Sequence, residues 1–253
     1  MDRLTYPDIA RIFGTGLIST GLGLLLFVLV TVFWGDPFTR LSENSAQDKL
    51  ERAFAEYAPA ADELRAAAVD PELTRTTAAV YKKRSPLGSN AGKLDIPSIN
   101  LHKVFVHGAR DEPFDDLQKG PGLYKEVAFP GSGQPLAIAG HRTTYGAPFL
   151  NIDQLDPGEI IRVTMPYGVF TYTVTRQQVI APNDWSILDY GAAERTGALR
   201  QRVKTTSQCL GAPRTCEHLV LTACHPKYSA ARRLAVFAKL SKVQLASTGA
   251  AAA

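Results

Sequence analysis

The sequence predicts an all-β domain, a sandwich or a barrel, preceded by one N-terminal transmembrane helix. From residue 93 to 240, short apolar runs alternate with clusters of Pro, Gly and Asp, which is typical of strands joined by turns. Before them lies an uncharged stretch over residues 12–34. The 253 residues leave room for one sizeable domain with appendages.

The uncharged stretch at residues 12–34 predicts the membrane helix. At about 1.5 Å per residue, a helix of this length crosses the roughly 30 Å hydrocarbon core of a bilayer. A cleaved signal peptide is the alternative, but its apolar region spans only about 7–15 residues and precedes a small-residue cleavage site. This stretch ends instead in Phe33 and Trp34, which suit a membrane interface.

The charges beside this helix predict its orientation. Arg3 and Arg11 precede it, and the positive-inside rule counts Lys and Arg only. We therefore expect residues 1–11 in the cytoplasm and the later domain outside the cell membrane, on a single-pass anchor. The formal net charge of +4, without long basic runs, does not favour a nucleic-acid partner.

Residues 35–92 are expected to form a stalk and a linker. Within them, residues 48–68 carry a partial helical stripe that Pro59 interrupts. Residues 70–92 contain several Pro, Gly, Ser and Asn residues and are predicted to be a linker. At the other end, residues 243–253 are predicted to be a flexible tail.

The strands are expected where the apolar runs fall. Strict alternation in the run that contains Phe170, Tyr172 and Val174 is typical of a half-buried strand. Short helices are expected only at residues 149–155 and 189–199. The predicted strands lie at residues 94–96, 104–106, 136–139, 159–164, 170–179, 219–223 and 234–240.

Cys224 stands at the end of the apolar run 219–223, and Pro226 then stops regular strand pairing. Nine residues after the cysteine, Arg233 opens the next apolar run. If these two strands pair, Arg233 lies across from Cys224. A nearby cation lowers the pKa of a thiol and stabilises a developing oxyanion. The alternative is a small buried side chain, which a free cysteine often is.

His141 follows the apolar run 136–139 and Gly140. A histidine at a strand exit can face a cleft and exchange protons near neutral pH. Cysteine and a distant histidine form the minimum set for thiol acyl transfer. The alternative is a hydrogen-bonded loop residue. His225, next to Cys224 on a strand, should point to the opposite face.

The other two cysteines, Cys209 and Cys216, are close enough in sequence to form a small disulfide ring. Cys224 would then be the leftover thiol, although three unpaired thiols remain the alternative. These cysteines, together with His218 and His225, could also supply metal ligands. The spacing lacks the C-x-x-C pairing of structural zinc sites, so we expect no metal and no cofactor.

These motifs match a known family. The segment Val220-Leu221-Thr222-Ala223-Cys224, followed by Arg233, resembles the sortase signature TLxTC…R. It departs from the signature where Val220 and Ala223 replace threonines. Ala139-Gly140-His141-Arg142 resembles the catalytic-histidine motif of sortases, and the resemblance extends from about residue 93 to 240.

The resemblance implies a closed sortase-type β-barrel of about eight strands with short helices, forming a catalytic domain over residues 93–242. It implies a cysteine transpeptidase with Cys224 as nucleophile, Arg233 at the oxyanion or substrate and His141 as proton donor and acceptor. Thr222 and Ala223 are implied to contact substrate. The implied partners are surface proteins with a C-terminal sorting signal and an amino group of peptidoglycan.

Two details resemble class E, the actinobacterial housekeeping type: Tyr145 in the segment 141–146, and Cys224-His225-Pro226. This implies LAxTG signals rather than LPxTG, and a substrate contact at Tyr145, although Tyr145 could also be a packing aromatic. Two other functions stay open. One is an inactive, membrane-tethered β-barrel binding module, and the other is a plain cysteine protease.

The C-terminus contains a copy of the implied substrate pattern. Leu245-Ala246-Ser247-Thr248-Gly249 matches LAxTG. A sorting signal also carries a downstream apolar helix and a basic end, and here only four alanines follow. The pattern is therefore either a disordered tail of small residues or a tethered ligand that competes for the enzyme's own groove.

Overall fold

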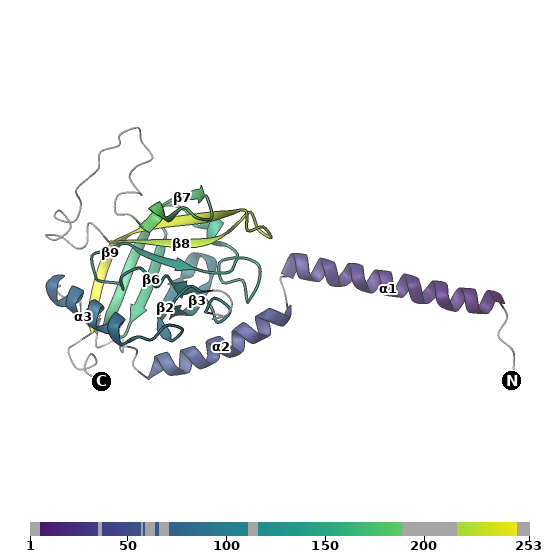
Figure 1. The fold of residues 1–253 in the computed structure, drawn as a ribbon, viewed down its shortest axis with the longest axis horizontal. Coiled ribbons are helices and arrows are strands. Elements are labelled where there is room, and N and C mark those ends of the chain that lie inside the picture. Colours follow the sequence, from purple (N-terminus) through teal and green to yellow (C-terminus); the bar gives the residue numbers. More distant parts are fainter. Residues whose placement is uncertain are drawn as a thin grey trace, which may run out of the picture.

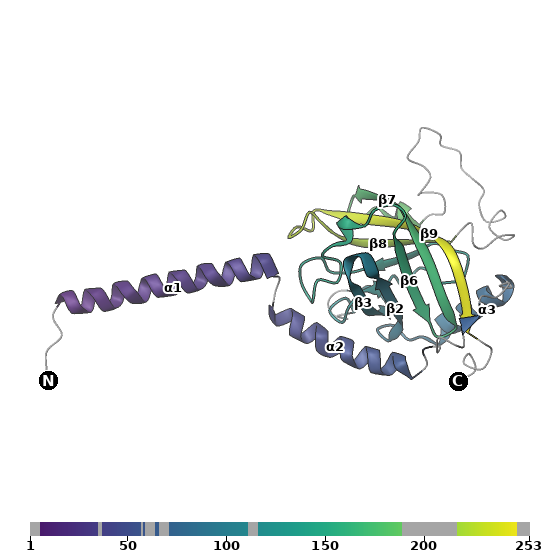
Figure 2. The same cartoon turned by 180° about the vertical axis from the view of Figure 1, so that it is seen from behind.

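The computed structural model describes residues 6–34, 37–56, 58, 64–65, 71–110, 116–188 and 217–246. Helix α1 (Tyr6–Trp34) projects away from a β-barrel, and helix α2 (Pro37–Ala55) runs back along the barrel wall (Figure 1). The reverse view shows the third helix, α3 (Pro71–Arg84), on the side of the barrel away from α1 (Figure 2).

Eight strands close the barrel in the order β9-β7-β6-β2-β3-β4-β5-β8, and β8 pairs with β9 to complete the ring. The pairs β3–β4 and β5–β8 are parallel, and the others are antiparallel. This confirms the predicted closed barrel. The strands are β2 (Asn90–Ile96), β3 (Leu101–His107), β4 (Gly122–Leu123), β5 (Leu136–Ala139), β6 (Ile160–Met165), β7 (Gly168–Ile180), β8 (His218–His225) and β9 (Arg232–Ala246).

Short elements complete the described fold. A two-residue strand, β1 (Leu64–Arg65), pairs with the end of β9. Three 3₁₀ helices are η1 (Pro97–Ile99), η2 (Ile152–Gln154) and η3 (Trp185–Leu188). The helix expected at residues 149–155 is thus only a 3₁₀ turn, because the chain is already extended at Leu155. The helix expected at residues 189–199 lies outside the described residues.

The core lies inside the barrel and is rich in aromatic side chains. Strand β7 shows the predicted alternation, since Phe170, Tyr172 and Val174 are buried while Thr171 and Thr173 between them are only partly buried. Burial of each large apolar side chain contributes about 1.5–3 kcal/mol. The largest fully buried side chains are Tyr172, Phe105, Phe129, Phe149, Phe170 and Phe237.

Helix α1 has the length and composition of a membrane span. Its segment Ala10–Val30 covers 21 residues with a mean hydropathy of 2.1, and none of it is buried against the rest of the chain. Among the described helices it alone meets these criteria. A long apolar helix whose span is not buried within the described part of the chain fits the predicted membrane anchor.

The structure differs from the expected stalk and linker in two places. Helix α2 begins at Pro37, earlier than expected, and ends at Ala55, before the break expected at Pro59. Part of the predicted linker forms α3, which begins at a proline suited to a first turn and ends on basic residues. Thr74, Ala78 and Tyr81 give α3 a helically spaced face that packs on the barrel.

The boundary of the predicted tail also changes. Strand β9 continues to Ala246, and Val243 pairs with Phe170 of β7. The long β7 needs a hydrogen-bonding partner along its whole length, which keeps residues 243–246 in the sheet. Residues 247–253 lie outside the described part of the chain.

Candidate active site

Two neighbouring parallel strands bring a histidine and a cysteine to the same edge of the barrel. Ala139 of β5 pairs with Thr222 of β8, and the Gly140 N–H donates to the Thr222 carbonyl over 3.0 Å. His141 and Cys224 each stand two residues beyond this pair. Because the strands run in the same direction, both residues leave the sheet at the same level.

On its other side, β8 pairs with β9, and Cys224 is directly opposite Arg233. This is the register that the sequence predicted. Cys224 therefore lies on the central strand of three, between the strand that leads to His141 and the strand that begins near Arg233. Its side chain is partly exposed, and its thiol is free within the described residues.

The guanidinium of Arg233 lies along the loop between β8 and β9. Its Nη1 donates to the carbonyl oxygens of Ala230, at 3.0 Å, and Arg232, at 3.1 Å. The side chain is half-buried. Both acceptors are neutral carbonyl groups, so neither bond neutralises the positive charge of Arg233.

A glycine and a phenylalanine fix the exit of β5. A Cβ on Gly140 would lie only 2.6 Å from Cδ2 of Phe149, so the fully buried Phe149 ring can pack there only against glycine. The Phe149 N–H also donates to the His141 carbonyl over 3.0 Å. Together these contacts hold the backbone of His141 at the barrel edge.

The ring of Tyr145 packs on the ring of His141, with centroids 4.8 Å apart and an interplanar angle of 36°. The backbone here is unusual, because Tyr145, Gly146 and Ala147 have φ values of 48°, 69° and 48°. Left-handed backbone costs non-glycine residues roughly 1–2 kcal/mol each. Tyr145 is thus both a packing aromatic and a partly exposed neighbour of His141, and its predicted substrate contact stays a prediction.

Arg142, which no motif of the sequence singled out, is a buried residue with 3% exposure. Its Nη1 lies 3.2 Å from the Cys224 carbonyl oxygen and 3.1 Å from Nδ1 of His225. Its Nη2 lies 2.8 Å from a carboxylate oxygen of Asp153. A guanidinium only donates, so His225 accepts at Nδ1 and, when neutral, carries its proton on Nε2. The partners are distant in sequence, and no local pattern reveals them.

Thr222 and Ala223 are more buried than a direct substrate contact suggests, since each side chain is 2% exposed. The Thr222 hydroxyl lies 3.0 Å from the hydroxyl of Tyr124, whose pKa is raised by burial. Ala223 packs in the hydrophobic core. Their substrate contacts stay predictions.

The similarity of this chain to known proteins lies mainly in the barrel. The sortase domain family matches residues 94–241, which include His141, Cys224 and Arg233. The chain belongs to the sortase family. The match covers the strands from β2 to β9 except for residues 90–93 of β2 and 242–246 of β9, and it leaves α1, α2 and α3 outside.

Individual sortases show how far the similarity reaches. The chain is 34% identical over 101 residues to sortase D of Bacillus subtilis, covering 40% of this chain and 48% of that one. It is 26% identical over 251 residues to sortase SrtE1 of Streptomyces coelicolor, covering 95% and 59%. The chain thus spans about half to three fifths of these relatives.

A solved structure of sortase E1 from Streptomyces coelicolor, with a tripeptide in its active site, superposes with a TM-score of 0.52. The identity is 25%, and the match covers 64% of this chain and 94% of that one. The similarity to sortase E agrees with the class E resemblance of the sequence motifs.

The remaining predicted site residues do not join this edge of the sortase barrel. His218 begins β8, at the end opposite Cys224. Cys209 and Cys216 lie outside the described residues, so their disulfide stays a prediction. Within the described ranges, no group of three or more His, Cys, Asp or Glu side chains is arranged to hold a metal.

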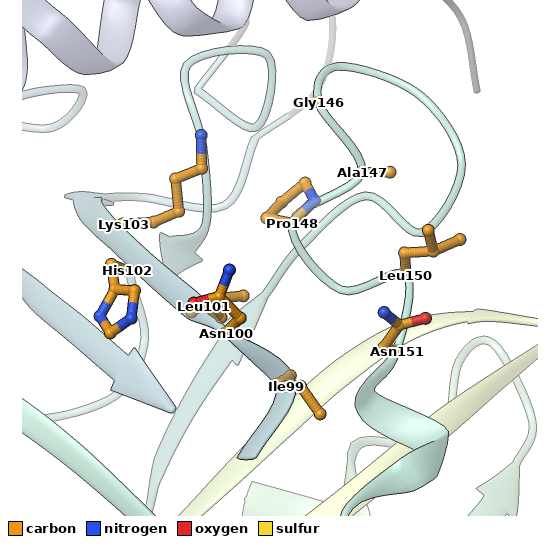
Figure 3. Close-up of a pocket in the computed structure, with 10 residues that line it drawn as sticks. All are labelled: Ile99, Asn100, Leu101, His102, Lys103, Gly146, Ala147, Pro148, Leu150 and Asn151. Carbon is orange, nitrogen blue, oxygen red and sulfur yellow. The ribbon is translucent and has the colours of Figure 1, made fainter. Parts of the chain in front are cut away.

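A cavity of about 250 Å³ lies behind the loop that carries Tyr145. One wall comes from the turn between η1 and β3, and the other from residues 146–151, while Lys103 points from the rim toward a helix (Figure 3). Cys224, His141 and Arg233 do not line it. It is therefore separate from the edge where the sortase motifs meet.

Proposed function

We propose that this chain is a membrane-anchored cysteine transpeptidase that cleaves a sorting signal between Thr and Gly and joins the surface protein to a cell-wall amino group. The observation that supports it most is the position of Cys224, on the strand between those that lead to His141 and Arg233. A nucleophile, a proton carrier and a cation at one edge are the parts that thiol acyl transfer needs.

In the first half of the reaction, the Cys224 thiolate attacks the threonine carbonyl carbon of the signal. The carbonyl oxygen becomes negatively charged, and the Arg233 guanidinium stabilises it or positions the substrate. The C–N bond to glycine then breaks, and the His141 imidazolium gives its proton to the departing amine. A thioester between the substrate and Cys224 remains.

In the second half, an amino group attacks the thioester carbonyl. His141, now neutral, removes a proton from the attacking nitrogen, and the C–S bond breaks to release Cys224 as a thiolate. The two halves return His141 and Cys224 to their starting protonation states. The thioester must therefore resist hydrolysis by water until the amine arrives.

Substrate preference and location belong to the same proposal. The resemblance to class E, with which the similarity to sortase E agrees, favours an LAxTG signal. The proposed source of the amine is peptidoglycan. With residues 1–11 in the cytoplasm and α1 across the membrane, the barrel lies outside the cell, where surface proteins and peptidoglycan meet. No cofactor enters any step.

One product analysis separates this function from its alternatives. The full chain in detergent micelles is incubated with LAxTG and LPxTG peptides, with and without a glycyl amine, and the products are identified by mass. Transpeptidation predicts the peptide–amine conjugate, formed faster from LAxTG. Hydrolysis alone, even at high amine concentration, would indicate a cysteine protease. Peptide binding without cleavage would indicate an inactive binding module.

A further inference from the structure

Helix α2 is docked on the barrel by buried polar contacts. Gln47, which is 4% exposed, donates from Nε2 to the carbonyl oxygens of Val104, at 2.9 Å, and Lys119, at 2.6 Å. Its Oε1 accepts from the Val104 N–H over 2.9 Å. One side chain thus pairs both backbone groups of a β3 residue, as a neighbouring strand would.

One turn earlier, Glu43 is fully buried and forms an ion pair with Lys103 of β3. The Lys103 Nζ lies 2.7 Å from Oε1 and 2.9 Å from Oε2. In Figure 3, Lys103 extends from the cavity rim toward the helix, and Gly146 lies on the loop across from it. A Cβ on Gly146 would clash with the Glu43 carboxylate, so α2 packs directly on this loop.

A further turn earlier, Thr39 contacts the same loop. Its Oγ1 accepts a hydrogen bond from the Tyr145 N–H over 2.8 Å. The Tyr145 backbone is in the left-handed region, and its ring packs on His141. A hydrogen bond from outside the loop offsets the cost of such a backbone, and it links α2 to His141 through one residue.

We propose that helix α2 is a component of the active site, in which Thr39 is a positioning residue that holds Tyr145 and, through its ring, His141. The inference rests on the proposed function, because it gives His141 a task in turnover. Helix α1 ends at Trp34 and α2 begins at Pro37, so the membrane anchor and the His141 loop are connected through one docked helix.

Two variants of Thr39 test the contact in the full chain in detergent micelles. Thr39→Val keeps the shape but removes the acceptor, whereas Thr39→Ser keeps the acceptor. Thr77→Val is the matched control, since the Thr77 hydroxyl donates within α3, to Leu73. Hydrogen exchange of the Tyr145 amide is measured by NMR, and kcat and KM are measured with an LAxTG peptide and an amine.

Thr39→Val is expected to speed Tyr145 exchange about tenfold and to lower kcat about three- to tenfold, with KM within twofold, because one hydrogen bond is lost. Thr39→Ser and Thr77→Val should match the unmodified chain. Unchanged exchange or kcat in Thr39→Val would overturn the inference, and so would failure of that variant to fold. If the unmodified chain shows no turnover, the proposed function fails, and the exchange measurement still decides the contact.

Discussion

The Nη1 atom of Arg142 lies 3.2 Å from the carbonyl oxygen of Cys224. Arg142 directly follows His141, so this bond ties the histidine segment to the backbone of the cysteine. The ion pair with Asp153 holds the guanidinium from its other side, with Lys227 Nζ 3.8 Å from the same carboxylate oxygen. The buried guanidinium of Arg142 thus helps to set the distance between the ends of β5 and β8.

Replacing Arg142 should therefore harm both stability and turnover. Arg142→Ala leaves Asp153 in contact with water but removes a charged donor from the Cys224 carbonyl, so we expect a loss of about 1–3 kcal/mol. We expect kcat/KM to fall about 100-fold. Arg142→Lys should recover only part of each, because an ammonium cannot replace a planar guanidinium with several partners. Urea unfolding and steady-state kinetics measure both effects.

Arg162, an exposed residue of β6, is the matched control for the loss of one positive charge. Arg162→Ala should change the free energy of unfolding by less than about 0.5 kcal/mol. If Arg142→Ala behaves like Arg162→Ala, the bond to the Cys224 carbonyl has no positioning role.

The register of β8 and β9 predicts which of two adjacent arginines matters. Arg233 pairs with Cys224, whereas Arg232 pairs with His225 and is exposed. Arg233→Ala should lower kcat by orders of magnitude, and Arg232→Ala should be mild, because adjacent strand residues face opposite ways. A severe Arg232→Ala with a mild Arg233→Ala would contradict the assignment of Arg233 to the oxyanion.

A buried carboxyl group predicts a pH dependence of stability. Glu217 is fully buried and accepts from the Gly131 and Gly133 N–H groups and from the Tyr172 hydroxyl, at 2.5 Å. Burial raises the pKa of Glu217 from its ordinary value of 4.5 to about 7, and the three hydrogen bonds offset only part of this rise. The folded barrel therefore favours the protonated form.

Because the folded pKa exceeds the unfolded one, the stability from Glu217 is complete below about pH 4.5 and is lost as the pH rises toward 7. The shift corresponds to about 3 kcal/mol between pH 4.5 and 8. Glu217→Gln should lower stability at pH 5 but remove this part of the slope. Urea unfolding of both proteins from pH 5 to 8 measures how the free energy of unfolding changes with pH. If it changes equally in both proteins, Glu217 is not the source of the pH dependence.

The C-terminal LASTG pattern should not be a substrate of its own enzyme. Leu245 pairs with Gly168 of β7 and with Arg65 of β1, so the first residue of the pattern is already held in the sheet. We expect the intact mass to stay unchanged when the full chain is incubated with an amine. Replacement of residues 249–253 by the amine would show instead that the tail reaches a groove.

The sequence pattern of short apolar runs and local turn residues predicted an all-β sandwich or barrel, and its resemblance to sortases implied that the barrel is closed. It also predicted that Arg233 lies opposite Cys224, since a short connection between two apolar runs favours a hairpin. The contacts of Arg142, Thr39 and Gln47 could not be predicted, because each joins segments far apart in the chain. The packed face of α3 is visible in the sequence as the helical spacing of Thr74, Ala78 and Tyr81. The surrounding Pro and Gly residues nevertheless favoured a linker.

Trapping the acyl enzyme would show whether Cys224 is the nucleophile. The full chain is mixed with an LAxTG peptide without amine and quenched in acid within seconds, and its mass is measured before peptide mapping. We expect one added mass on Cys224, equal to that of the peptide up to its threonine less one water, and its loss in Cys224→Ala or after adding a glycyl amine. An adduct on Cys209 or Cys216, or cleavage that continues in Cys224→Ala, would contradict it.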